Sequence, residues 1–356
     1  MEKLVQPTSS DKKRVMYFDL LNILACFCVV CQHTNSKFGD FMPTAGWIEC
    51  AFVGTICHWA VPVFFMLSGA TLLKYRERYS TADFFKRRFS RILIPYIIWT
   101  VLLYFLDKQY QKADGILDMG KQIAHHLLKA DVMGPFWFFA PLFAVYLMMP
   151  VFSLLAKEKY KKLFYYYIGI CFVTQSVLPV ADLLLHTSIA KEIAPFFQLF
   201  NVYWMYVCLG YVLSSTDIPK KWRISIYLAG ILSFVFQFAY QLVISFQTGK
   251  PNEDLSPYEY FPVIVIAVAV FVFFRYLPLH KLESNQKIST VISKIASCSF
   301  GIYFMHVLVY RWILTFDFVD VDRFIWRFPI RFAVYFICLA ITALLKKIPV
   351  LKKIVP

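Results

Sequence analysis

The sequence predicts an all-α membrane protein with about ten transmembrane helices and both termini in the cytoplasm. Hydrophobic residues make up 59% of the 356 residues and charged residues only 17%, whereas soluble domains contain about 45 to 50% and about 25%. The mean hydropathy is +0.58. The apolar residues gather in long runs, and short Lys and Arg clusters separate these runs.

Runs of about 20 mostly apolar residues are long enough to cross the hydrocarbon core as helices. Ten runs meet this criterion, and the weakest is short and ends at Pro179. The predicted spans are 15–34, 53–73, 90–106, 136–156, 163–180, 195–214, 224–246, 257–277, 295–315 and 325–345.

The basic residues predict the orientation, because cytoplasmic loops are enriched in Lys and Arg. Most of the 37 fall in the N-terminal tail, the loop after the second span and every second connection after it. We therefore expect a cytoplasmic tail over 1–14, a membrane domain over 15–345 and a cytoplasmic tail over 346–356. The first span is too long for a signal peptide and no convincing cleavage site follows it, so we expect it to remain. The longest outer loop, 107–135, has apolar residues at helical spacing and predicts an amphipathic helix on the membrane face.

Charge and cysteine usage exclude several other classes. A net charge of +15 would suggest nucleic acid as a partner for a soluble domain. Here the basic residues flank apolar runs, as topology determinants do, so we expect membrane lipids and no nucleic acid. Seven of the nine cysteines lie within apolar runs and lack metal-site spacing, so we expect buried thiols, no disulfide framework and no metal.

Ionisable groups within a span cost about 2.5 to 3.5 kcal/mol each on insertion scales and are functional candidates by default. The first span, YFDLLNILACFCVVCQH, contains Asp19 near its inner end, Asn22, and His33 near its outer end. Eleven residues return to nearly the same helical face, so Asn22 and His33 share a stripe. His33 is either an interfacial histidine or a general base, since imidazole can take and return a proton near neutral pH.

Other polar positions keep two interpretations each. His306 lies deep in SCSFGIYFMHVLVY and is either bonded to a neighbouring helix or part of a site. We expect His58 at the membrane interface, and Ser68 with Gly69 in close helix packing. Trp137 could anchor an aromatic belt or form a cavity wall.

The basic stretch FFKRRFSRILIPY enters the third span from the cytoplasmic side. Its arginines are Arg87, Arg88 and Arg91. They can anchor the helix by the positive-inside rule, or clamp phosphate oxygens with their forked donors. A cytosolic donor that carries a nucleotide would fit both interpretations.

Five motifs together resemble the acyltransferase-3 family of integral-membrane acyltransferases over residues 15 to 345. They occur in the family's order and relative positions: YFDLLNILACFCVVCQH, HWAVPVFFMLSGATLL, FFKRRFSRILIPY, WFFAPLFAVYLMMP and SFGIYFMH. The resemblance implies a bacterial plasma-membrane enzyme that transfers an acyl group, usually acetyl from cytosolic acetyl-CoA, to a carbohydrate hydroxyl on the other side. The chain ends soon after the tenth span, so we expect no fused extracytoplasmic domain and a lipid-linked or nascent surface glycan as acceptor.

The resemblance also assigns residues. His33 matches the catalytic histidine, and Arg87, Arg88 and Arg91 match the basic motif on the CoA side. Further motif positions are Ser68, Trp137, Tyr303 and His306; we expect Tyr303 and His306 to stabilise the oxyanion, and Asp19, Asn22, Ser68 and Trp137 to bind substrate. We also expect one continuous, water-accessible passage through the bundle from these arginines to His33.

One position departs from the family pattern. The family places an arginine eleven residues before the histidine, where this chain has Asn22. Either Arg14, Lys13 or an arginine from another helix substitutes, or the chemistry is altered. A transporter of a lipid-linked precursor or an organic anion is therefore the alternative, and a catalytically dead scaffold is a third.

Overall fold

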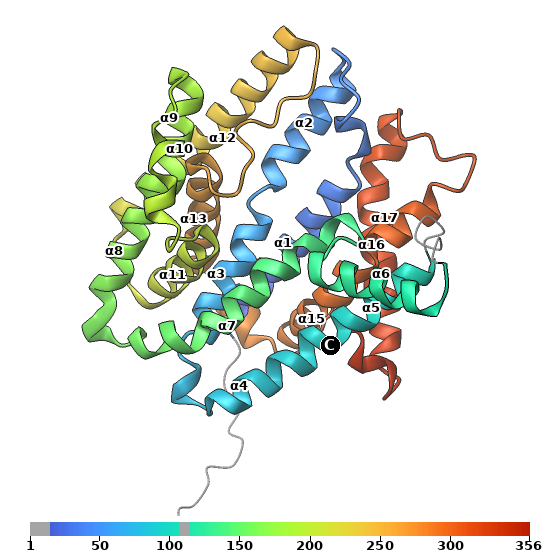
Figure 1. The fold of residues 1–356 in the computed structure, drawn as a ribbon, viewed down its shortest axis with the longest axis horizontal. Helices are drawn as coiled ribbons and strands as arrows, with labels where there is room; N and C mark the ends of the chain where they lie inside the picture. Colours follow the sequence, from blue (N-terminus) through green and yellow to red (C-terminus); the bar gives the residue numbers. More distant parts are fainter. Residues whose placement is uncertain (1–14, 107–113) are drawn as a thin grey trace, which may run out of the picture.

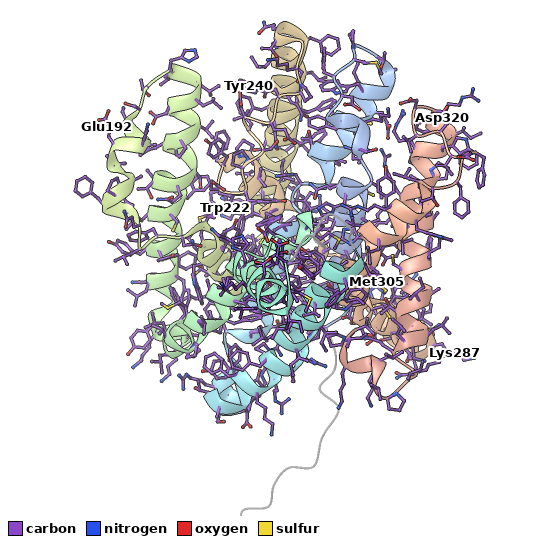
Figure 2. All side chains as sticks on the ribbon, turned by 45° about the vertical axis from the view of Figure 1, so that its right-hand side comes forward. Glu192, Trp222, Tyr240, Lys287, Met305 and Asp320 are labelled. Carbon is purple, nitrogen blue, oxygen red and sulfur yellow. The ribbon has the colours of Figure 1, made fainter. Side chains whose placement is uncertain are left out.

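The computed structural model describes residues 15–106 and 114–356, and in these residues the chain forms helices and loops without strands. Figure 1 shows a bundle with α4 (Thr81–Arg88) at its lower end and α9 (Leu178–Leu185) at its upper end. We call these the α4 end and the α9 end. In Figure 2, Lys287 lies toward the first and Asp320 toward the second, with Met305 near mid-height. The other long helices are α1 (Met16–His33), α2 (Ala45–Cys57), α3 (Ala60–Leu72), α5 (Ile94–Leu106), α6 (Ile116–Lys129), α7 (Phe139–Leu155), α8 (Lys161–Phe172), α11 (Val202–Ser215), α12 (Lys220–Thr248), α13 (Phe261–Arg275), α15 (Gln286–Ser297), α16 (Ser299–Ile313) and α17 (Phe324–Leu345).

Each of the ten predicted runs contains a helix, although 198–201 and 257–260 within these runs are not helical. Within the described residues, seven helical segments are long and apolar enough to cross a membrane, and two bent pairs raise this to nine. The bent pairs are Ile189–Phe197 with α11, at 74°, and α15 with α16, at 54°. The remaining apolar helix, α13, has 15 residues and falls short of the span criterion. The chain is a multi-pass membrane protein, while the count of ten and the side of each terminus stay predictions.

The predicted tail over 1–14, with Lys13 and Arg14, lies outside the described residues. The segment after α17 is packed: Trp99 Nε1 on α5 donates to the Ile354 carbonyl at 2.8 Å, and Val355 is fully buried. The end of the chain therefore docks on the bundle.

Two prolines explain where the third and fifth spans change pitch. Pro95 and Pro179 lack an N–H and crowd the carbonyl four residues earlier, so the regular hydrogen bond cannot form there. In each case a π turn precedes the proline, at Phe89–Leu93 and at Val173–Val177. The second turn keeps the helical segment continuous from Glu158 to Leu185, beyond the predicted end at Pro179.

Helices α3 and α11 cross in direct backbone contact, with a glycine from each helix at the crossing point. A Cβ on Gly69 of α3 would lie 1.9 Å from the Val207 carbonyl oxygen, and a Cβ on Gly210 of α11 would lie 1.8 Å from that of Met66. Only glycine permits this backbone contact. The prediction that Gly69 serves close helix packing is confirmed.

The amphipathic helix predicted in the longest outer loop is present as α6, while 107–113 lie outside the described residues. Ile123 and Leu127 pack on the core, whereas Ile116 and Leu128 are exposed.

A long segment between α12 and α13, residues 249–260, enters the bundle from the α9 end; we call it the strap. α12 has 29 residues and α13 has 15, so at 1.5 Å per residue they measure about 43 and about 22 Å and the strap covers much of the difference. Buried polar side chains of α12 hold it. Gln237 and Gln241 donate to the carbonyls of Leu255 and Asn252 at 3.0 and 3.1 Å, and Ser245 Oγ accepts from the Asn252 N–H at 2.9 Å.

Candidate active site

The polar stripe of α1 faces the bent pair α15–α16, and the two helices run parallel in register. Each contact joins residues 273 or 274 positions apart. At one end Asn22 Nδ2 donates to the Ala296 carbonyl at 3.0 Å, and at the other Ser36 Oγ lies 2.8 Å from the Tyr310 hydroxyl. Between them His33 meets His306. The prediction that Asn22 and His33 share a face is confirmed, and that face covers α15 and α16.

The two histidines form a directed hydrogen-bond chain. His306 Nδ1 lies 2.6 Å from the Tyr303 carbonyl and 3.2 Å from the Ile302 carbonyl. Because carbonyl oxygens only accept, His306 Nδ1 carries the proton, and in the neutral ring Nε2 is then an acceptor. His33 Nδ1 lies 3.0 Å from that Nε2 and must donate to it. This leaves His33 Nε2 with a lone pair, the form that a general base needs.

Burial differs between the two rings. His306 is fully buried, whereas His33 is only partly buried. His306 is therefore placed to orient His33, and His33 is the ring of the pair that keeps exposed surface.

A cavity of about 300 Å³ opens between α1, α3, α7 and α16. Asp19 and Asn22 line it from α1, and Ser68 from α3. Ser299 and Tyr303 close it on the α16 side, one turn before His306. The cavity thus gathers four of the predicted site residues, Asp19, Asn22, Ser68 and Tyr303.

A second, basic cavity of about 540 Å³ adjoins the first at the α4 end. Arg78, Arg87, Arg88 and Arg91 line it. The two cavities share Thr71, Leu72 and Arg88, so Arg88 stands at their junction. The three arginines predicted on the CoA side therefore surround one mouth of the central cavity.

Arg88 also bears on the position where the family has an arginine on α1. Its guanidinium carbon lies 5.9 Å from the ring centroid of Tyr146, and its Nε is buried without a partner among the described residues. Asn22 lines the same cavity. An arginine from another helix thus shares this cavity with Asn22, whereas Arg14 and Lys13 lie outside the described residues.

His33 itself does not line either cavity, contrary to the expectation of one open path from the arginines to this ring. The Tyr303 side chain forms the end wall, and its hydroxyl donates to the Pro135 carbonyl. Its ring centroid is 5.7 Å from that of His306. The hydroxyl hydrogen of Tyr303 and the Nδ1 hydrogen of His306 are therefore both engaged, and neither is aimed into the cavity as an oxyanion donor.

Tyr258, His58 and Trp137 form an aromatic wall beside the strap. Tyr258 of the strap stacks on His58 at a centroid distance of 4.5 Å and on Trp137 at 5.5 Å. His58 Nδ1 lies 2.9 Å from Gln32 Nε2, next to His33, and its Nε2 lies 2.5 Å from the Ser256 carbonyl. Trp137 is a wall residue and does not line the two cavities. The His58 ring contacts the strap and α1, and its expected place at the membrane interface stays a prediction.

Sequence reasoning missed Ser299, which lines the central cavity with a buried hydroxyl that has no partner among the described residues. Ser299, Tyr303 and His306 lie on one face of α16, since their spacings are four and three residues. A serine in SCSFGIYFMH carried that signal, but an isolated hydroxyl in a span is also common in packing.

A buried ionic cluster fixes the segment that follows His33. Glu49 on α2 contacts Arg327 Nε at 2.6 Å and Arg331 Nη1 at 2.5 Å on α17. Arg331 Nη2 lies 3.5 Å from Asn35 Oδ1, two residues after His33. In the short 3-10 helix after α1, Lys37 Nζ is 2.7 Å from Asp322 Oδ1, and this hydrogen bond raises the pKa of the Lys37 ammonium above its usual value. The end of α1 is therefore attached to both α2 and α17.

No group of three or more metal-ligating side chains occurs in the parts of the chain that the structure describes, and the nine cysteines are free and buried. Comparison with known proteins adds one finding. A family model described as an acyltransferase domain, that of the acyltransferase-3 family, matches residues 15–346, nearly the whole chain. No curated protein matches significantly, and no solved structure does. The match agrees with the all-helical multi-pass fold and favours an acyltransferase over a carrier or a scaffold. The chain belongs to the acyltransferase-3 family and is a membrane acyltransferase.

Proposed function

We propose that this enzyme moves an acetyl group from cytosolic acetyl-CoA to a hydroxyl of a carbohydrate on the opposite face of a bacterial plasma membrane. The observation that carries the proposal is the chain from the Tyr303 carbonyl through His306 to His33, which leaves a basic Nε2 on the more accessible ring. A lipid-linked sugar or nascent surface glycan is the acceptor that could reach a site inside the bundle.

The basic cavity supports a phosphate-bearing donor. Arg87, Arg88 and Arg91 converge on it, and guanidinium groups bind phosphate oxygens through paired N–H donors. A thioester arm that entered past Arg88 would run along Thr71 and Leu72 into the central cavity. Its mostly apolar walls, with a few polar groups, suit a slender acyl chain.

The reaction balances with His33 as the only proton carrier. The acceptor hydroxyl attacks the thioester carbonyl carbon while His33 Nε2 takes its proton. The carbon–sulfur bond then breaks, and the CoA thiolate leaves and takes the proton back from His33. His306 Nε2 accepts from His33 Nδ1 throughout and stabilises the transient imidazolium. Because Tyr303 closes the cavity, the reaction requires this wall to move.

The unengaged donors on the cavity wall are the best candidates to stabilise the oxyanion. Ser299 Oγ and Arg88 Nε are both buried and unpartnered among the described residues. Buried donors aimed at developing charge act more strongly than donors in water. Ser68 is less suited, because its hydroxyl donates to the Phe64 carbonyl at 3.0 Å.

The test uses purified protein and its release of free CoA from acetyl-CoA without acceptor, since water can replace the sugar hydroxyl. We expect His33→Gln to lower this rate about 10²- to 10⁴-fold, the usual contribution of a general base. His125→Gln, an exposed histidine on α6, is the matched control and should retain activity. Mass spectrometry of surface glycans from deletion and complemented strains then identifies the acceptor. A His33→Gln protein with full activity would refute the proposal, and so would a wild-type protein that neither binds nor hydrolyses acetyl-CoA.

A further inference from the structure

A third cavity lies on the far side of the strap, between α9 and α10 (Ile189–Ile193), with a volume of about 500 Å³. Clefts of about 300 to 1,000 Å³ hold small ligands. The proposed reaction does not use it. Its polar lining comprises Thr174, Gln175, Asp182, Lys191, Glu259 and Tyr260.

Charged side chains and non-helical backbone occur together at this cavity, inside a bundle of membrane-spanning helices. The strap descends from the α9 end toward the short helix α13, so Glu259 and Tyr260, the last strap residues, lie below the end of α12 and are half-buried; the Phe261 ring that follows them stacks on Phe236 of α12 at a centroid distance of 6.0 Å. Non-helical backbone at membrane depth is tolerated only where it is buried or lines a water-filled cavity. A carboxylate at that depth is costly unless it serves such a site. We therefore treat the cavity as an aqueous inlet from the α9 end.

Two of the lining groups, Asp182 and Thr174, are already hydrogen-bonded within the protein and have a structural role. The Asp182 carboxylate accepts from Thr187 Oγ1 at 2.5 Å and from the N–H groups of Ile189 and Ala190 at 3.0 and 2.6 Å. Thr174 donates to the Ile170 carbonyl at 2.8 Å. The Asp182 bonds fix the loop between α9 and α10, and the Thr174 bond stays within the helical segment before Pro179.

Other groups are available to a ligand. Gln175 stands on the π turn before Pro179, and π turns occur frequently at functional sites. Its amide, the Glu259 carboxylate and the Lys191 ammonium have no hydrogen-bond or ion-pair partner among the described residues. They offer donors and acceptors on three sides, beside the ring of Tyr260.

We infer that this cavity is a saccharide subsite that takes a neutral, hydroxyl-rich ring. A carboxylate accepts from two hydroxyl groups, an amide and an ammonium complete the pattern, and a tyrosine face covers the apolar C–H side of a sugar. The carboxylates of Asp182 and Glu259 outnumber the single ammonium of Lys191, so the net negative charge of the lining disfavours an anionic ligand. The assignment rests on the proposed function in one respect, that the bound ring belongs to the acyl acceptor.

The strap connects this subsite to the histidine pair. Tyr258, next to Glu259, stacks on His58, and His58 contacts Gln32 beside His33. The Tyr206 hydroxyl donates to the Tyr258 carbonyl at 2.5 Å and holds the strap from α11. The path from the subsite toward the base therefore passes through the side chains of Tyr258, His58 and Gln32.

Cysteine accessibility provides the test, because the nine native thiols are buried. Gln175→Cys should react with a membrane-impermeant maleimide added on the extracytoplasmic side, much faster than the native protein. Val173→Cys is the matched control, since Val173 is on the same π turn, is 50% exposed and does not line the cavity. A thiol that faces lipid should stay unlabelled.

Protection then identifies the ligand class. Maltotriose at millimolar concentration should slow the labelling of Gln175→Cys at least threefold, and glucuronate should not. Equal labelling at the two positions, no protection by maltotriose, or equal protection by glucuronate would each overturn the inference. Acetyl-CoA hydrolysis by the unsubstituted protein is measured in parallel. If it is absent while protection holds, the proposed reaction fails and the saccharide subsite stands.

Discussion

The hydrogen bond between His33 and His306 predicts that substitution of His306 lowers the reaction rate less than substitution of His33 does. In His306→Phe the His33 Nδ1 hydrogen loses its acceptor, which lies 3.0 Å away in a fully buried ring. An unsatisfied buried donor costs about 1 to 3 kcal/mol. At about 1.4 kcal/mol per factor of ten, the rate of CoA release should fall roughly 5- to 140-fold, toward the lower end of the range for loss of the base itself.

The assay separates orientation from donor binding. His306 does not line the donor cavities, so His306→Phe should lower kcat and leave KM for acetyl-CoA within about twofold of wild type. His306→Gln should recover part of the rate, because its amide oxygen can accept from His33. His125→Gln again serves as the control for protein levels. A His306→Phe protein with unchanged kcat would refute the hydrogen-bond chain, and one as inactive as His33→Gln would make His306 the base.

Three further predictions follow from the packing and the charges. Arg88→Gln should raise KM for acetyl-CoA more than Arg87→Gln, because Arg88 stands at the junction of both cavities, and comparable effects would contradict that position. Gly210→Ala should destabilise the protein by about 1 to 3 kcal/mol through overpacking, since its Cβ would lie 1.8 Å from the Met66 carbonyl oxygen. An unchanged thermal midpoint in detergent would show that the crossing can relax. Glu49→Gln should cost about 3 to 5 kcal/mol by leaving two buried arginines uncompensated, and unfolding scans that match wild type would disprove the role of this cluster.

The helices themselves were readable from the sequence because hydrocarbon imposes a simple rule. A lipid-exposed segment must satisfy its backbone internally, so long apolar runs become helices whatever their neighbours. Each of the ten predicted runs contains a helix for this reason. Their ends were less predictable, because Pro179 produced a π turn within a continuous helix where a termination was expected.

The candidate site was also predictable only in part. The stripe of Asn22 and His33 follows from helical geometry and is present as predicted. The oxyanion role expected for Tyr303 and His306 depended on where their hydrogens point, and backbone carbonyls of Pro135 and of Tyr303 itself engage both. Ser299 was overlooked, since one hydroxyl in an apolar run does not reveal whether it faces a cavity.

The sequence alone determined that this chain is a membrane protein and which side chains share one face of a helix, because hydropathy and helical period are local properties. Which helix meets which face is a property of the packed bundle: the parallel register of α1 against α16 sets the tautomer of His33, and the glycine crossing of α3 and α11 lies beside the cavity. The strap is likewise positioned by residues that lie far from it along the chain, the Tyr206 hydroxyl and the His58 ring. Distances between distant segments arise only when the bundle closes, so the active-site geometry could not be read from the sequence.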